Sequence, residues 1–143
     1  MKRNAGFTLL EILVVVLIIT ILATIVGVQV AQQPGRARAA AAEAQMVIFR
    51  SALSSYRMHH GYYPTAAQGL QALVRPPSRP PIPESYPDEG YMESRNLPSD
   101  PWNRPFIYVV PGPDGARYDV VTYGADGEPG GEGEAADIRL SDL

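Results

Sequence analysis

The chain has 143 residues, a length that allows one compact domain, and it contains no cysteine, which excludes disulfides and thiolate metal sites. The formal net charge is −3 at pH 7, but the only lysine, Lys2, lies beside Arg3 at the N-terminus, whereas residues 114–143 are strongly acidic. This acidic C-terminal part excludes the basic surface of a nucleic-acid-binding protein and would attract cations instead.

Residues 7–30 are predominantly apolar and predict a helix that crosses a membrane. At 1.5 Å per residue these 24 residues span roughly 36 Å, more than the hydrocarbon core of a bilayer, which is about 30 Å thick. Lys2 and Arg3 precede the run, so we expect a cytoplasmic N-terminus and a single pass. A cleaved secretory signal peptide fits less well, because its apolar core is shorter and is closely followed by a small-x-small site. Glu11 is unexplained, since a charge within the bilayer costs at least about 2.5 kcal/mol.

A second helical pattern follows the apolar run. Apolar residues recur at steps of three and four across residues 39–56, which predicts an amphipathic helix. Pro34 should kink the helix, because proline removes a backbone donor and clashes with the preceding turn. His59 and His60 end the pattern, and because neighbours on a helix face different ways, a helix-end role is favoured over a metal site. One kinked helix over about residues 7–60 is therefore expected.

The rest of the chain predicts short elements separated by loops. Thr65 followed three residues later by Gln68 is typical of a capping box, so a short helix should begin there. Residues 76–87 are rich in proline and predict an extended loop. Residues 106–110 and 118–123 read as two strands of a β-hairpin. The predicted fold class is α+β, with the long helix covering one face of a small antiparallel sheet.

The stretch GFTLLE, residues 6–11, resembles the class III leader of type IV pilins and type II secretion pseudopilins. The resemblance implies that a membrane peptidase, the prepilin peptidase, cuts between Gly6 and Phe7 and methylates the new N-terminal residue. It also gives Glu11 a partner, because the new ammonium of Phe7 on a neighbouring subunit is a buried cation that needs a buried anion.

Three further motifs narrow the resemblance: YPT followed by QGLQALV, LP followed by DPW, and YD followed by GADG. Together they are similar to the major pseudopilins of type II secretion systems, the general secretion pathway protein G family. Asn103 stands where that family usually has glycine, and the tryptophan common near the family's C-terminus is absent. The resemblance implies a leader over residues 1–6, a transmembrane and filament-core helix over 7–30, and a periplasmic domain over 31–143.

The acidic loop, residues 124–138, contains five carboxylates and almost no apolar side chain. Alone it should be disordered, because its charges repel one another and it has little to bury. Bound Ca²⁺ would order it, since calcium takes six to eight oxygen ligands in flexible geometry. An EF-hand is excluded because Gly130 and Gly133 replace a ligand and a core residue, Asp137 replaces the bidentate glutamate, and no flanking helices are predicted. A solvated loop without an ion stays the alternative.

Resemblance to the major pseudopilins supplies a specific ligand set for Ca²⁺. The side chains of Asp126 and Asp137 would bind the ion. Backbone oxygens of three further residues would complete the shell: Tyr123, Glu128 and Arg139.

The sequence contains no motif of an enzyme, such as HExxH or a phosphate-binding P-loop, so we expect a structural protein. The resemblance implies a subunit of the bacterial inner membrane that assembles with its own copies into a periplasmic filament, the pseudopilus, which drives export of folded proteins across the outer membrane. Implied partners are the prepilin peptidase, minor pseudopilins and the inner-membrane secretion platform. Two alternatives stay open: a type IV pilin for adhesion or DNA uptake, and a monomeric membrane-anchored binding domain.

Overall fold

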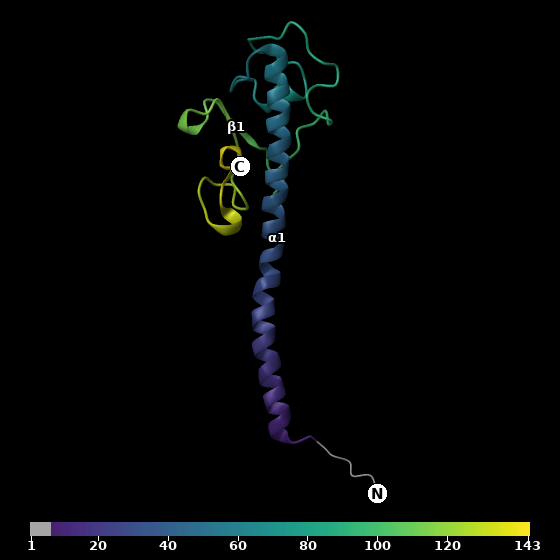
Figure 1. Ribbon diagram of the computed structural model, residues 1–143, viewed down its shortest axis with the longest axis vertical. Helices are drawn as coiled ribbons and strands as arrows, with labels where there is room; N and C mark the ends of the chain where they lie inside the picture. The colour runs from purple at the N-terminus through teal and green to yellow at the C-terminus, as the bar shows by residue number, and fades with distance from the viewer. Residues whose placement is uncertain (1–6) are drawn as a thin grey trace. The chain divides into compact units, whose positions relative to one another are not determined.

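The computed structural model describes residues 7–143, except that the side chains of residues 24–33 lie outside the description. The predicted leader, which includes Gly6, therefore lies outside the described residues. The chain divides into two compact units, Met1–Pro34 and Gly35–Leu143. The helix α1 (Leu9–His60) contributes residues to both units, and the sheet lies in the second (Figure 1).

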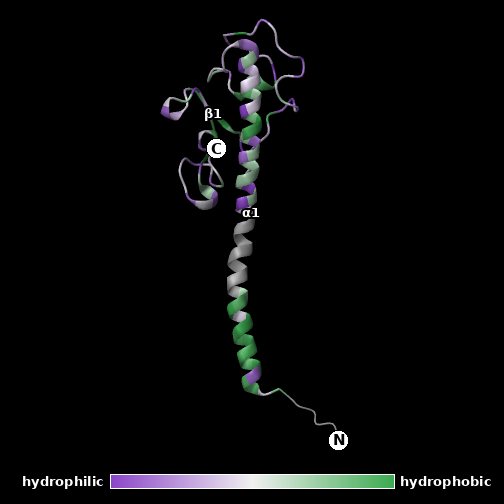
Figure 2. Ribbon diagram, viewed as in Figure 1, coloured by the Kyte–Doolittle hydropathy of each residue, from purple (hydrophilic) through white to green (hydrophobic). Residues whose placement is uncertain are grey.

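In the first unit, α1 begins with a side-chain cap. The backbone N–H of Glu11 donates to Thr8 Oγ1 at 3.2 Å, which satisfies one of the free donors of the first turn. The side chains around this cap and after it are exposed and mostly apolar; Phe7 is 78% exposed and Leu9 81% (Figure 2). Within the described residues, no helix meets the length and hydropathy required to cross a membrane. Residues 24–30 of the predicted span lie outside the described side chains.

In the second unit, α1 is amphipathic as predicted. Five side chains at alternating steps of four and three are fully buried: Ala42, Met46, Phe49, Leu53 and Tyr56. The helix ends at His60, followed by Gly61 in a left-handed conformation (φ 82°), whose N–H donates to Arg57 O at 2.7 Å. Pro34 lies inside α1 at the boundary of the two units, so the kink stays a prediction.

The reciprocal bonds predicted between Thr65 and Gln68 are confirmed, but they close a turn, and the helix begins only at Leu70. The N–H of Thr65 donates to Gln68 Oε1 at 3.0 Å, and the N–H of Gln68 donates to Thr65 Oγ1 at 3.3 Å. The helix that follows is a single 3-10 turn, Leu70–Leu73, shorter than a regular helix because the proline-rich loop comes directly after it. Gln68 also donates to the carbonyls of Arg79 and Pro81 at 2.8 Å, so one buried amide fixes the start of this loop.

Three short strands form an antiparallel sheet in the order β1-β2-β3. They are β1 (Ile107–Val109), β2 (Asp119–Thr122) and β3 (Ile138–Arg139), and the remaining 3-10 turns are Pro113–Gly115, Gly133–Ala135 and Leu140–Asp142. The predicted hairpin of β1 and β2 is confirmed, with Tyr108 opposite Val120. The sheet packs on α1 through the buried core, where the rings of Phe49 and Phe106 meet edge to face at 5.2 Å. The second unit is therefore an α+β fold, as expected.

Candidate functional site

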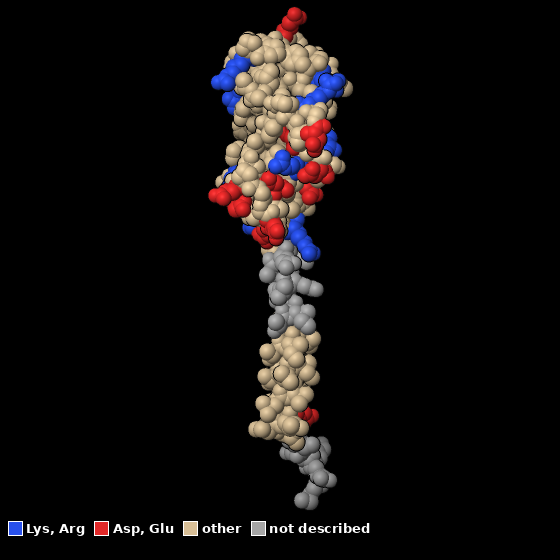
Figure 3. All heavy atoms as spheres, turned by 90° about the vertical axis from the view of Figure 1, so that its left-hand side faces the viewer, with Lys and Arg blue, Asp and Glu red and all other residues tan. Residues whose placement is uncertain are grey.

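The acidic loop connects the central strand β2 to the edge strand β3 of the small sheet. Figure 3 shows carboxylates grouped with a few guanidinium groups on the side of the second unit where this loop lies. The loop leaves β2 through Gly124, which has a left-handed backbone (φ 57°). A Cβ atom at this position would lie 2.7 Å from Ala136 O, so only glycine allows the two ends of the loop to approach each other.

The predicted ligands are held by local hydrogen bonds. Asp126 Oδ1 accepts the N–H of Glu128 at 3.1 Å, and the carbonyl of Tyr123 accepts the N–H of Gly127 at 3.1 Å. These bonds turn the chain sharply after β2. The loop thus has an ordered course of its own, which differs from the disorder expected from its charges alone.

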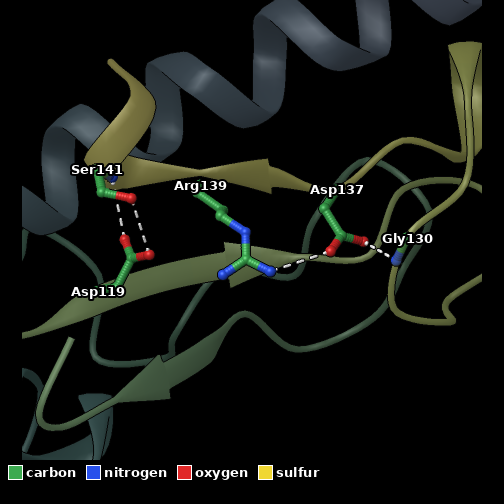
Figure 4. Close-up of polar contacts among 5 residues, drawn as sticks. All are labelled: Asp119, Gly130, Asp137, Arg139 and Ser141. Atoms are coloured by element: carbon green, nitrogen blue, oxygen red, sulfur yellow. Dashed lines mark hydrogen bonds and ion pairs between the residues drawn. The ribbon is translucent and has the colours of Figure 1, made fainter. Parts of the chain in front are cut away.

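At the other end of the loop, Asp137 is the central acceptor (Figure 4). Its Oδ1 accepts the N–H of Gly130 at 3.0 Å, and its Oδ2 forms an ion pair with Arg139 Nη2 at 3.3 Å. The structure therefore brings the side chains of Asp137 and Arg139 together, and the role of the Arg139 carbonyl as a calcium ligand stays a prediction.

The donor set of the loop fits a calcium ion chemically. Two carboxylates and three backbone carbonyls are the hard oxygen ligands that Ca²⁺ prefers. The guanidinium of Arg139 would have to release Asp137 Oδ2 for that oxygen to bind a metal. In the part of the chain that the structure describes, no three His, Asp or Glu side chains lie close enough to hold a metal ion. The predicted ligand set contains only two side chains, the others being backbone carbonyls, so a search for three side chains does not test it. The calcium site therefore stays a prediction.

Asp119 is a structural residue that strand alternation failed to identify, because all four residues of β2 are buried. Its carboxylate accepts the N–H of Val120 at 2.8 Å and both the N–H and the hydroxyl of Ser141, at 3.1 and 3.0 Å (Figure 4). Arg50 on α1 donates to Leu140 O at 2.9 Å. The C-terminal turn is therefore fixed without the tryptophan that the family usually has there.

The turn before β1 is organised by a second buried carboxylate, Asp100. Its Oδ1 accepts the N–H groups of Trp102 and Arg104 at 3.0 and 2.8 Å, and its Oδ2 accepts the hydroxyl of Thr122 on β2. Asn103 has φ 65°, the left-handed region in which asparagine is the best substitute for glycine. This explains how Asn103 can replace the glycine that is usual in the family.

Comparisons with known proteins decide the family. Residues 29–141 match the family described as "Type II secretion system (T2SS), protein G", and residues 1–27 match the prokaryotic N-terminal methylation motif. The chain belongs to the type II secretion system protein G family. The family resemblance seen in the sequence is thereby confirmed, and the methylation motif covers Gly6, Phe7 and Glu11.

Individual protein G relatives match over nearly their whole length. The type II secretion system core protein G of Pseudomonas aeruginosa is 40% identical, with 96% of this chain and 94% of the relative covered. The protein G of Vibrio cholerae is 43% identical, with 96% and 92% covered.

The fold also matches a solved structure. The crystal structure of the major pseudopilin from the type 2 secretion system of enterohaemorrhagic Escherichia coli aligns with a TM-score of 0.65 and 35% identity, over 76% of this chain and 90% of that one. The chain is thus a pseudopilin, a structural subunit of the pseudopilus and not an enzyme.

Proposed function

We propose that the chain, after cleavage between Gly6 and Phe7, leaves the inner membrane and assembles through α1 with its own copies into a periplasmic filament that drives protein export. The observation that carries this proposal is the exposed apolar surface of the first unit, which needs lipid or another protein to cover it. Before assembly, residues 7–30 would cross the inner membrane once with a cytoplasmic N-terminus, and residues 31–143 would be periplasmic. The prepilin peptidase, minor pseudopilins and the inner-membrane platform are the partners this assembly requires.

Within the filament, Glu11 would pair with the ammonium of Phe7 on a neighbouring subunit. Glu11 lies in the exposed first turn of α1, four residues after Phe7, so its carboxylate is available to another copy. The test is Glu11→Ala, compared with Glu89→Ala, which removes an exposed glutamate from the second unit. Glu11→Ala should abolish filament formation while membrane insertion and leader cleavage persist. Filaments that form as with the unaltered chain would contradict the pairing.

The acidic loop would bind one Ca²⁺ through the side chains of Asp126 and Asp137 and the backbone oxygens of Tyr123, Glu128 and Arg139. The ordered turns at Asp126 and Asp137 support this proposal, because they place hard oxygen donors at both ends of one loop. The test is thermal unfolding of the full chain in detergent, with EDTA and then with calcium. Calcium should raise the midpoint, because an ion that binds only the folded state must stabilise it.

Two variants locate the ion. Asp126→Ala and Asp137→Ala should each remove the calcium-dependent rise, whereas Asp88→Ala, which changes an exposed aspartate elsewhere, should keep it. A midpoint that calcium leaves unchanged in the unaltered chain would refute the site.

A further inference from the structure

Arg104 reaches from the turn before β1 into the acidic loop. Its Nη1 donates to Gly124 O at 2.8 Å, and its Nη2 donates to Ala125 O at 3.1 Å and to Asp126 O at 3.2 Å. One guanidinium therefore holds three successive carbonyls of the loop. This uses the fixed fork of donors that arginine has and lysine lacks.

The backbone that carries Arg104 is itself held in place. Its N–H donates to the buried carboxylate of Asp100 at 2.8 Å, and its carbonyl accepts the N–H of Asp100 at 2.7 Å. Asp100 is in turn bound by the hydroxyl of Thr122 on β2. The backbone of Arg104 is thus fixed by the sheet and the turn that precedes it, outside the loop that the guanidinium contacts.

The loop is built to admit this side chain. Gly127 has φ 73°, and a Cβ atom there would lie 2.5 Å from Arg104 Cζ. The glycine thus serves two purposes: it turns the chain after Asp126, and it leaves room for the guanidinium. The positive charge also stands beside a loop with five carboxylates, where it offsets part of their mutual repulsion.

The oxygens that Arg104 takes differ from those proposed for calcium. Arg104 binds the carbonyls of residues 124–126, whereas the proposed ion uses the carbonyls of Tyr123, Glu128 and Arg139. Asp126 belongs to both sets: its carbonyl binds Arg104, and its carboxylate, which also accepts the N–H of Glu128, is a proposed ligand of the ion. Fixing the Asp126 backbone therefore fixes the direction of a calcium ligand.

We propose that Arg104 is the positioning residue of the acidic loop: its guanidinium holds residues 124–126 in the shape that presents the Asp126 carboxylate to Ca²⁺. The part that concerns calcium rests on the function proposed above. The part that concerns the shape of the loop does not depend on the ion. Preorganisation of this kind raises affinity, because the cost of ordering the ligands has already been met.

Two measurements on the full chain in detergent test the proposal. The first is calcium titration by calorimetry after removal of metal with EDTA. Arg104→Ala should weaken calcium binding by at least about tenfold, because charge-assisted bonds to three carbonyls are lost. Arg104→Lys keeps the charge but donates from a single nitrogen. Its calcium affinity should therefore lie between that of the unaltered chain and that of Arg104→Ala. Arg95→Ala, which changes an exposed arginine outside the loop, should leave the affinity unaltered.

The second measurement is amide hydrogen exchange in EDTA. The N–H groups of Ala125 and Gly127 donate to Glu134 O and Tyr123 O, at 2.8 and 3.1 Å, and report directly on the shape of the loop. Their exchange should become about tenfold faster in Arg104→Ala, and less so in Arg104→Lys, while core amides such as that of Val120 are unaffected.

The two readouts separate the two proposals. If the unaltered chain binds no calcium, the calcium site is refuted, and the exchange rates alone decide the role of Arg104. Should Arg104→Ala fail to fold, Arg104→Lys supplies the same comparison. Exchange rates of Ala125 and Gly127 within twofold of the unaltered chain, in a folded variant, would overturn the proposal.

Discussion

The two described parts of α1 differ in what stabilises them. In the second unit one stripe of the helix is buried against a sheet, and side chains such as Phe49 and Leu53 have no exposed surface. In the first unit the helix exposes apolar side chains in succession; Leu13, Leu17 and Ile19 are each more than half exposed. One part of the helix is therefore stabilised within its own chain, and the other requires different molecules around it. Substitutions in the two parts should accordingly affect different measurements.

The largest effect on folding is expected from Phe49→Ala. The ring is fully buried and meets Phe106 edge to face, so its removal leaves a cavity and should cost about 3–5 kcal/mol of unfolding free energy. Val47→Ala on the same helix changes a side chain that is 47% exposed and should cost less than about 1 kcal/mol. Urea unfolding of the full chain in detergent measures both. Equal losses would contradict the buried stripe.

Leu17→Arg in the first unit should impair membrane insertion and assembly but not the folding of the second unit. Under the proposed membrane insertion, an arginine near the middle of the span costs about 2.5–3.5 kcal/mol on insertion scales. Membrane insertion and filament formation should therefore fall, while the unfolding free energy of the second unit stays unaltered. Leu17→Ile serves as the apolar control. A variant that inserts normally but unfolds more easily would remove the distinction between the two units.

Asp119→Ala should have the next largest effect within the second unit. It removes an acceptor that serves Val120 and both donors of Ser141, and hydrogen bonds to a charged group contribute about 1.5–3 kcal/mol. Asp142→Ala, which changes the exposed penultimate residue, is the matched control. Unfolding of the two variants measures the difference. Exchange of the Ser141 amide should also accelerate only in Asp119→Ala, and its failure to do so would contradict the assigned contact.

Local patterns predicted the helix and the β1–β2 hairpin of the second unit, but not β3 (Ile138–Arg139), which was counted in part as acidic loop. The stripe from Ala42 to Tyr56 follows the helical repeat, and the reciprocal bonds of Thr65 and Gln68 follow from their spacing. The polar contacts of Asp100, Arg104 and Asp119 could not be predicted in this way. Each of these residues contacts another that lies up to 22 positions away in the sequence, and tertiary packing decides which distant residues meet.

The acidic loop shows the same limit at the candidate site. Its charges alone predicted a disordered segment, because the five carboxylates repel one another and the sequence identifies no cationic side chain that would bind them. The missing partner, Arg104, lies 20 positions before Gly124 and is recognisable only once β1 and β2 are paired. A motif resemblance supplied the proposed ligand residues of the loop, but it gave no reason for their positions.

The smallest expected effect is a loss of stability as the pH falls. Burial, with a contribution from neighbouring His59, lowers the pKa of His60 below its usual 6.5, and its Nε2 lies 2.6 Å from the Tyr91 hydroxyl. The folded chain therefore binds a proton at His60 less readily than the unfolded chain, so this contribution is zero well above pH 6.5 and becomes destabilising as the pH falls through that value. The thermal midpoint should decrease slightly between pH 7.5 and pH 5, and His60→Gln should remove that part of the decrease. A midpoint that depends on pH equally in both chains would assign the effect to other groups.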